Sequence, residues 1–458
     1  MIATSSDLDV RRAYARDVSG LELVPEFVAR PSSAEETVEV IKEAFAARIP
    51  ITTAGGQSST TAASITDVGV ILSLRALAGP IQVNPETRTV RVDAGVIVAD
   101  VRRAAAEHGL LFAPDPTSEE ESTVGGAVAC NASGARSLRY GATRPHVRAL
   151  TVAMANGDVM EFRRPELEKN TVGFALAHDP VDWFVGSEGT LGVVLSAEFK
   201  LLPLPVHSIG LAIPFASEAS ALAFVVAARR SLLVNPRCLE YFDELALTIA
   251  RESEGGAAPG RTGSCMVYAE ETGSDLNPDA ELPLDAWLEL AETHGADTSD
   301  IRVYDSEPAL LIARKLRHAV PSTMNERGAR YRSAGGRKVS TDWAVPFPLL
   351  ANTLMKARAH ADAAGIEQAV AYGHAGNGHP HQNFIARDAD ELKRIEKVVE
   401  TTLHDVLGVG GTVAAEHGIG KLKRKWLPLQ MSDVQQRAMR ALKNELDPRG
   451  LLAPGNVL

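Results

Sequence analysis

The chain has 458 residues, of which 45% are hydrophobic and 23% charged, and its formal net charge is −11 at pH 7. This length predicts two or three domains with buried cores, and the composition is that of an ordinary globular protein. An acidic chain without a block of lysine and arginine is poorly suited to binding nucleic acid, because neutralising phosphates supplies most of that affinity.

The N-terminus and the cysteines indicate the cellular location of the protein. Residues 1–17 lack the apolar segment of a secretory signal, and no run of about 18 uncharged apolar residues occurs to span a membrane. Cys130, Cys238 and Cys265 are far apart and odd in number, which argues against a disulfide framework and against a four-cysteine iron–sulfur cluster. We therefore expect a cytoplasmic protein, with peripheral membrane association left open. If the protein is a redox enzyme, its partner electron carrier lies on another molecule.

The first half predicts alternating helices and strands. Residues 33–48 begin with a capping-box pattern, Ser33 to Glu36, and their apolar side chains then fall on one helical face. A short apolar strand follows and ends in the glycine-rich segment 54–60. Further predicted elements are strands at 68–74 and 89–96, a helix at 98–110, a glycine-rich segment at 114–134, a hairpin at 149–162 with its turn at Asn156-Gly157, and a closing segment at 186–205.

The second half differs in its sequence pattern, because it contains long predicted helices rich in alanine and leucine. Two late prolines before residue 206 indicate a boundary, so the chain is expected to divide into 1–205, 206–407 and 408–458. Short strands at 368–372 and 379–386 flank a glycine loop. The predicted helices are 217–232, 308–319, 349–364, 388–407 and 432–446.

The segment YGHAGNGHPHQN, residues 372–383, holds three of the twelve histidines of the chain. Its glycines and Pro380 exclude a helix, so the histidines cannot be ligands spaced along a helical face. The glycines instead allow a sharp turn between two strands, which brings His374 and His381 close. In an extended chain, His379, His381 and Asn383 share one face, as expected of a strand that lines a site.

Two histidines make a weak metal site, and AAEHGIG (414–420) offers a third ligand, Glu416. Two histidines and a glutamate with an open position are typical of a catalytic divalent metal. The alternative is that these are two polar turns on unrelated surfaces. His417 could act as a general base, because imidazole accepts a proton near neutral pH, or it could be a structural surface histidine.

Three glycine-rich stretches could contact phosphates. GIGK is not a P-loop, because Ala415 and Leu422 stand where a glycine and a hydroxyl residue are needed. No G-x-G-x-x-G follows the first strand, which argues against a nicotinamide cofactor on a Rossmann fold. AGGQSST (54–60) fits pyrophosphate binding through backbone N–H groups, or it is only a flexible turn. Taken alone, TVGGAVACNASG (123–134) is better explained by tight packing of small residues.

Taken in order, these segments resemble a known family. The motifs are the Gly-Gly loop, RTVRVDAGV, PDP, TVGGAVACNASG, GSEGTLGVV, GHxGxGxxHxN, EHGIG and a terminal LDPxGLLxPG. They are similar to the FAD-linked D-2-hydroxyacid dehydrogenases of the vanillyl-alcohol-oxidase-like superfamily, over nearly the whole chain. The resemblance implies an α+β fold: a two-subdomain FAD-binding domain at 1–205, an α+β cap with an antiparallel sheet at 206–407, and a C-terminal segment that packs back on the FAD domain and completes the active site.

The resemblance also assigns roles to residues. His374, His381 and Glu416 match divalent-metal ligands for zinc, manganese or iron, and His417 matches the base. Arg317 matches the arginine that pairs with the substrate carboxylate, and Lys338 and Asn383 are further substrate candidates. The FAD residues would be Gly55, Gly56, Gln57 and Ser58 at the pyrophosphate, Pro116, Thr117, Ser122, Gly125, Gly126, Asn131 and Gly134 along the flavin, and Glu188, Gly192 and Val194 at the adenosine end or ring edge.

Some positions depart from the family pattern. Thr53 and Ala54 replace an arginine and a glycine of the usual loop, Ala453 replaces an asparagine near the end, and GNGH replaces GDGN, which introduces His379. No histidine or cysteine lies in the pyrophosphate loop, so FAD is expected to be non-covalent.

The expected activity is oxidation of a D-lactate-like D-2-hydroxy acid to the 2-oxo acid. The expected electron acceptor is an external cytochrome, quinone or electron-transfer flavoprotein. A homodimer is among the expected assemblies. The alternatives are an oxygen-using oxidase of glycolate, another alcohol or a sugar acid, an enzyme of the ether-lipid synthase type, and a non-catalytic flavoprotein subunit of a larger complex.

Overall fold

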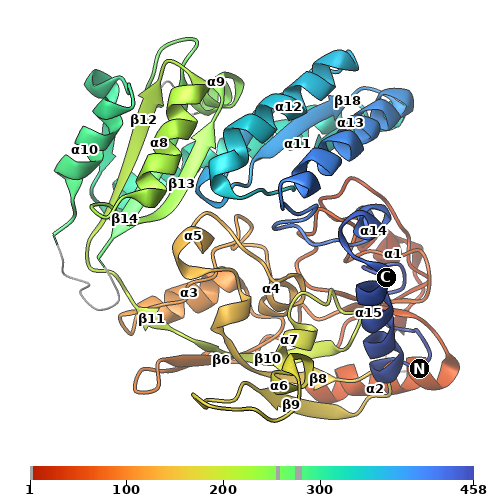
Figure 1. Cartoon of the computed structure of the whole chain (residues 1–458). Coiled ribbons are helices and arrows are strands. Elements are labelled where there is room, and N and C mark those ends of the chain that lie inside the picture. Colours follow the sequence, from red (N-terminus) through yellow and green to blue (C-terminus); the bar gives the residue numbers. More distant parts are fainter. Residues whose placement is uncertain (1–3, 254–257, 274–280) are drawn as a thin grey trace. The chain divides into compact units, whose positions relative to one another are not determined.

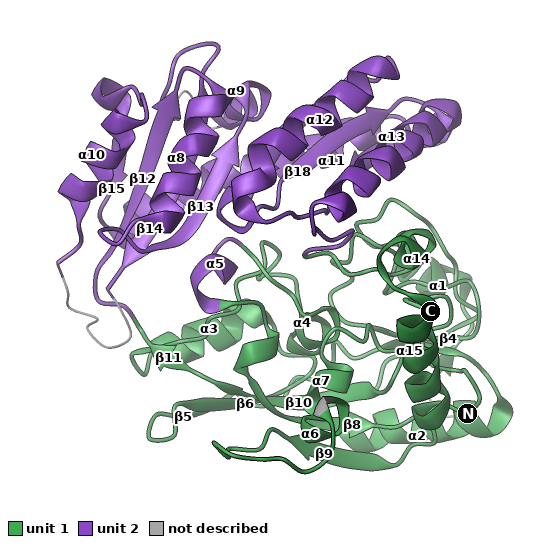
Figure 2. Cartoon of the chain, viewed as in Figure 1, with its two compact units in different colours: residues 1–134, 141–204, 416–458 green, residues 135–140, 205–415 purple. Residues whose placement is uncertain are grey.

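The computed structural model describes residues 4–253, 258–273 and 281–458 (Figure 1). Two compact units share the chain (Figure 2). Unit 1 holds residues 1–134, 141–204 and 416–458, and unit 2 holds residues 135–140 and 205–415. Both units combine helices with sheets, and the predicted α+β class with antiparallel sheets is confirmed.

The first sheet of unit 1 has the strand order β1-β2-β4-β3, in which β2, β4 and β3 are parallel. Helix α2 connects β2 to β3 and buries Val40 and Ile41 against this sheet. Ser33 caps α2 by accepting the Glu36 N–H at 3.2 Å, whereas the Glu36 carboxylate accepts from the Ser32 N–H rather than from that of Ser33. The elements are β1 Thr4–Ser5, α1 Leu8–Ala13, β2 Phe27–Ala29, α2 Ala34–Ala47, β3 Ile51–Ala54 and β4 Val70–Ser73.

The second sheet of unit 1 is antiparallel, with the order β5-β6-β10-β8-β9, and its core also takes in side chains of α3 and α4. The Asn156-Gly157 turn joins β8 to β9 as predicted, with Gly157 at φ +84°. The elements are β5 Gln82–Asn84, β6 Thr89–Asp93, α3 Val98–Ala106, β7 Leu110–Leu111, α4 Val124–Cys130, β8 Val147–Ala153, β9 Val159–Arg163, α6 Ala175–His178, α7 Val181–Phe184, β10 Val193–Lys200, β11 Leu202–Pro203, α14 Leu427–Gln430 and α15 Asp433–Leu446.

Unit 2 is built on one seven-stranded sheet with the order β15-β12-β14-β13-β17-β18-β16, and every neighbouring pair is antiparallel. The elements are α5 Ser137–Tyr140, β12 Ser208–Phe215, α8 Glu218–Arg230, β13 Pro236–Phe242, α9 Glu244–Ser253, β14 Cys265–Thr272, α10 Leu284–Thr293, β15 Arg302–Tyr304, α11 Glu307–Ala329, β16 Arg337–Ser340, α12 Leu350–Ala363, β17 Val370–Gly373, β18 His381–Ala386 and α13 Ala389–Gly408.

The pairing register decides which side chains share a face of this sheet. Cys238 pairs with Glu270, and Tyr372 pairs with both Phe242 and His381. Because side chains alternate along each strand, Glu240, Glu270 and His381 therefore point to the same side. Helices α9 and α11 cover that side, since their apolar residues form one core with Phe242 and Tyr372.

Helix α11 is longer than the predicted stretch of 308–319. It continues through Pro321 to Ala329, and Val320 and Met324 are fully buried. Proline lacks the N–H of a helical hydrogen bond, so the sequence alone indicates a break. Burial of the following turns in the core of unit 2 outweighs that local cost.

Candidate functional site

The histidine-rich segment folds as two strands joined by a tight turn. Strand β17 ends at Gly373, a 3-10 turn covers Ala375–Asn377, and β18 begins at His381. Gly373 has φ +123°, and a Cβ there would lie 2.7 Å from the His381 ring. Gly378 has φ +69°, and its Cβ would lie 1.9 Å from the Val345 carbonyl oxygen. A side chain at either glycine would therefore disrupt the turn that holds the histidines together.

This turn gathers three buried histidines. His374, His379 and His381 are 3%, 4% and 8% exposed, and their ring centroids lie 4.6–5.4 Å apart. One ligand atom from each of them and one from Glu416 lie within 4.8 Å of one another. Glu416 directly follows Ala415, whose N–H donates to the Asp342 carbonyl within unit 2 at 2.8 Å. The structure thus brings the predicted ligands together and adds His379 to them.

Two of these histidines each contact a buried carboxylate. Glu240 Oε1 lies 2.7 Å from His374 Nδ1, and Asp342 Oδ1 lies 3.2 Å from His379 Nε2. Metal-ligating histidines characteristically donate their second N–H to a carboxylate, which fixes the tautomer. If His374 Nδ1 donates to Glu240 in this way, its Nε2, which lies 3.3 Å from Arg317 Nη2, is the nitrogen that could face an ion. The donor set of three imidazoles and one carboxylate fits a divalent transition metal.

The predicted substrate arginine adjoins this cluster. Arg317 Nε forms an ion pair with Glu240 Oε2 at 2.8 Å, and Arg317 Nη2 lies 3.3 Å from His374 Nε2. Glu240, which is 1% exposed, therefore holds both the arginine and a histidine. No motif pointed to Glu240 or Asp342, because each comes from a segment distant from the histidines.

The other predicted substrate residues lie on the same sheet. Asn383 is fully buried two residues beyond His381, and neither end of its amide makes a hydrogen bond with the residues the structure describes. Lys338 in β16 donates to Asn325 Oδ1 at 2.6 Å, and burial lowers the pKa of Lys338 to about 8. Both residues remain predicted substrate contacts.

The loop after β3 has the properties of an anion site. Among the described residues, none accepts a hydrogen bond from the backbone N–H groups of residues 55–60, and the Thr60 hydroxyl is buried without a partner. Consecutive unsatisfied N–H groups form a concavity that binds anions such as phosphates. The loop lies against residues 121–123, since a Cβ at Gly56 would meet the Glu121 carbonyl oxygen at 2.0 Å. This loop fits the predicted pyrophosphate of FAD.

The other predicted FAD residues of unit 1 occupy tightly packed positions. A Cβ at Gly125 would lie 2.7 Å from the Ala94 Cβ, one at Gly134 would lie 2.0 Å from the Asp115 carbonyl oxygen, and one at Gly192 would lie 2.5 Å from Val152. Ser122 and Val194 are buried, and Ser58 Oγ lies 3.0 Å from Ser122 Oγ. Asn131, at φ +49°, ends α4 and accepts from the Arg144 N–H.

Glu188 contacts the C-terminal segment of unit 1. Its carboxylate accepts from the Ile419 N–H at 2.6 Å and from the Gly420 N–H at 2.7 Å, and burial raises the pKa of Glu188. The Thr61 hydroxyl donates to the His417 carbonyl at 3.4 Å. The segment that carries His417 is therefore anchored to unit 1 on both sides of Gly418.

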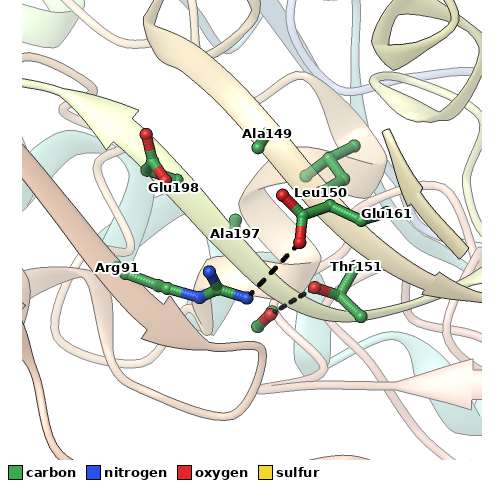
Figure 3. A pocket seen from close by; sticks show the side chains of 8 residues that line it. Arg91, Ala149, Leu150, Thr151, Glu161, Ala197 and Glu198 are labelled. Carbon is green, nitrogen blue, oxygen red and sulfur yellow. Dashed lines mark hydrogen bonds and ion pairs between the residues drawn. The ribbon is translucent and has the colours of Figure 1, made fainter. Parts of the chain in front are cut away.

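A shallow hollow lies elsewhere in unit 1, over the five-stranded sheet (Figure 3). Arg91 and Glu161 form an ion pair of 3.9 Å across it, and the Ser196 hydroxyl donates to Thr151. Its lining includes none of the predicted site residues, so we assign it no role in the chemistry.

Comparison with known proteins supports the FAD assignment. Residues 204–457 match the family described as FAD linked oxidases, C-terminal domain, and residues 25–163 match the FAD binding domain. The first match alone covers more than half of the chain. The chain belongs to the FAD-linked oxidase family. Its predicted identity as an FAD-linked oxidoreductase is confirmed.

Relatives of this FAD-linked oxidase match it over almost their full length. The D-2-hydroxyglutarate dehydrogenase of Xanthomonas citri pv. viticola is 31% identical, covering 94% of this chain and 89% of the relative. The D-lactate dehydrogenase of Archaeoglobus fulgidus is 30% identical, with 94% and 91% covered. The glycolate oxidase subunit GlcD of Bacillus subtilis is 28% identical, with 98% and 92% covered.

A solved structure has the same fold. Alkyldihydroxyacetonephosphate synthase superposes with a TM-score of 0.73 at 18% identity, covering 98% of this chain and 82% of that one. At this identity the likeness concerns the fold alone. Within the described part of this FAD-linked oxidase, no helix has both the length and the apolar character needed to cross a membrane.

Proposed function

We propose that this FAD-linked oxidase oxidises a D-2-hydroxy acid to the 2-oxo acid. The observation that carries the proposal is the group of three buried histidines and the half-buried Glu416, with Arg317 beside His374. A 2-hydroxy acid presents a carboxylate next to a hydroxyl, and a guanidinium and a divalent ion are suited to these two groups. The names of the relatives specify D-lactate, D-2-hydroxyglutarate and glycolate, which are all 2-hydroxy acids.

In this proposal Arg317 binds the substrate and His417 takes up its proton. Arg317 binds the substrate carboxylate through its outer nitrogens, while its Nε stays on Glu240. His417 accepts the hydroxyl proton at an imidazole nitrogen as the hydrogen on C2 leaves with its electron pair and the C2–O double bond forms. FAD, when bound, supplies the acceptor for that hydride.

A divalent ion held by His374, His379, His381 and Glu416 would supply positive charge for the developing alkoxide oxygen. An external acceptor, a cytochrome, a quinone or an electron-transfer flavoprotein, then removes the two electrons.

Anaerobic mixing of the purified flavoprotein with a 2-hydroxy acid tests this proposal. We expect a yellow protein whose flavin absorbance near 450 nm is bleached by one enantiomer, with release of the 2-oxo acid. A flavin that no D-2-hydroxy acid reduces would contradict the proposal. Rapid reoxidation by oxygen with release of peroxide would instead support the oxidase alternative.

The pH dependence of substrate binding tests the role of Lys338. Its pKa near 8 means that it loses its positive charge as the pH rises through that value. If Lys338 contacts the substrate carboxylate, KM should rise by about tenfold between pH 8 and pH 9.5, with a smaller change in kcat. Lys338→Met should show the high KM already at pH 7 and a flat profile.

The control for this experiment is Lys397→Met, which changes an exposed lysine of α13. It should leave both KM and the pH profile unchanged. A Lys338→Met variant that retained the wild-type profile would show that Lys338 serves only its hydrogen bond to Asn325.

A further inference from the structure

A single buried carboxylate joins three elements of unit 2, and the proposed chemistry does not use it. Asp243 lies between the end of β13 and the start of α9, and it is 7% exposed. Its Oδ2 accepts from the Ala371 N–H of β17 at 2.6 Å, and its Oδ1 accepts from the Ala246 N–H of α9 at 2.8 Å. Burial raises the pKa of Asp243 to about 6, so the carboxyl group is ionised at neutral pH and accepts both bonds.

The backbone at Asp243 explains why its side chain makes the bond to β17. In a regular antiparallel ladder the Asp243 carbonyl would accept from Ala371, because the Asp243 N–H donates to the Ala371 carbonyl at 2.9 Å. The Asp243 carbonyl instead accepts from the Leu247 N–H at 2.8 Å, which is the first turn of α9. The chain changes from strand to helix at this residue, so the carboxylate supplies the acceptor that the backbone has given to the helix.

The ladder between β13 and β17 is short. In the described residues, the paired positions of these strands are Tyr241 with Gly373 and Phe242 with Tyr372. The same register, continued by one residue, sets Glu240 opposite His374, where Glu240 Oε1 lies 2.7 Å from His374 Nδ1. At the other end of the ladder, the two bonds between Asp243 and Ala371 hold the register. The contact of Glu240 with His374 therefore depends on bonds made three residues away.

The groups around this carboxylate hold it in place. Arg358 of α12 forms an ion pair of 3.5 Å with Oδ2, and its other outer nitrogen donates to Glu218 Oε1 at 2.6 Å. The Gln368 amide nitrogen lies 3.4 Å from the same Oδ2, and the Gln368 oxygen accepts from Gln382 Nε2 at 2.8 Å. Gln382 is 1% exposed in β18, the strand that carries His381. A carboxylate with these partners is fixed, which suits it to hold a strand rather than to react.

We propose that Asp243 is a positioning residue for the histidine cluster, because its carboxylate fixes β17 on β13 in the register that sets Glu240 against His374. The inference rests on the proposed function only for the ion that the cluster holds. Without the bond from Ala371, β17 shifts on β13, and His374 loses the orientation that its contact with Glu240 provides. Asp243 therefore acts on the site through two strands and not by contact with the reacting groups.

Asp243→Ser in the full-length, FAD-loaded protein tests this role. Serine caps helices about as well as aspartate, but its single oxygen cannot also reach β17. In metal-free protein with isotope-labelled histidine, we expect the NMR signal of the His374 ring N–H, assigned by its loss in His374→Asn, to shift or broaden. The affinity for cobalt, used as the probe ion, should fall by about tenfold, the lower end of the effect of losing a partner of a ligand histidine.

Asp388→Ser is the matched control. Asp388 caps α13 of the same unit by accepting from the Asp390 N–H at 2.9 Å and the Glu391 N–H at 2.8 Å, so the substitution and the capping role are the same. It should leave the His374 signal unchanged and the cobalt affinity within about twofold. A lower Tm in Asp243→Ser, with an unchanged His374 signal and an unchanged cobalt affinity, would show a purely structural role and overturn the inference.

Two measurements keep this inference separable from the proposed function. If the wild type binds no cobalt, the proposed ion site fails, and the His374 signal still decides the role of Asp243. If Asp243→Ser does not fold, Asp243→Asn replaces it, because the amide keeps the shape of the carboxylate and has a single oxygen for the two N–H groups. An unchanged His374 signal in that folded variant likewise contradicts the positioning role.

Discussion

Replacing His417 with asparagine should lower kcat by about 10²- to 10⁴-fold, the usual contribution of a general base. Asparagine is similar in size to part of the imidazole ring but cannot accept the hydroxyl proton at neutral pH. The segment should remain in place, because Glu188 accepts from the amides of Ile419 and Gly420 and Thr61 donates to the His417 carbonyl. Stopped-flow measurement of flavin reduction gives the rate of the chemical step directly.

The matched control is His404→Asn, which removes an exposed histidine of α13 and should leave the rate unchanged. FAD content and metal content should equal those of the wild type in both variants, so a lower rate reports proton transfer. Flavin reduction within threefold of the wild-type rate in His417→Asn would assign the base to another group.

If the histidine cluster holds a divalent ion as we propose, removal of that ion should abolish turnover, and restoring it should recover turnover. Lewis-acid stabilisation of an alkoxide is worth several kcal/mol, so we expect a loss of at least about 10³-fold after dialysis against a chelator. A substitution at His379, which replaces the asparagine of the usual GDGN motif, tests separately whether His379 is one of the metal ligands. His379→Asn should weaken metal affinity by about 100-fold or more, and Asp342→Asn, which removes its carboxylate partner, by about 10- to 100-fold.

Metal content measured by mass spectrometry after dialysis, together with the visible spectrum of the cobalt-substituted protein, follows the ligand set without relying on turnover. His360→Asn is the control, because His360 also contacts a carboxylate, Asp405 at 2.7 Å, but lies outside the cluster. A His379→Asn protein with wild-type metal content and an unchanged cobalt spectrum would show that His379 is not a ligand.

Local patterns were sufficient to predict many individual elements. The capping residue Ser33 and the apolar periodicity after it predicted α2, and the Asn156-Gly157 turn predicted the hairpin of β8 and β9. These signals concern interactions among residues a few positions apart, which the sequence displays directly. The glycines of the segment 372–383 were likewise interpretable, since a side chain at Gly373 or Gly378 would combine a positive φ with a clash against a neighbouring residue.

The surroundings of the site depend on pairing between distant strands. Glu240 reaches His374 because β13 pairs with β17, although 134 residues separate the two. Asp342 reaches His379 in a comparable way, where β16 runs beside β18. Such contacts follow from burying whole sheet faces, so no spacing within one segment could have identified these carboxylates.

The buried carboxylate of Glu270, which accepts from Arg136 and Arg237, illustrates the same limit most clearly. Arg136, Arg237 and Glu270 come from three segments far apart in the chain, and each looks in the sequence like an ordinary solvated charge. Two kinds of information are therefore separable in this chain. Residue types and short-range spacing specify helices, turns and the family motifs, and with those motifs the predicted ligands and base. The three-dimensional fold specifies which charges are buried together, because desolvation and electrostatic balance depend on every element that surrounds a group.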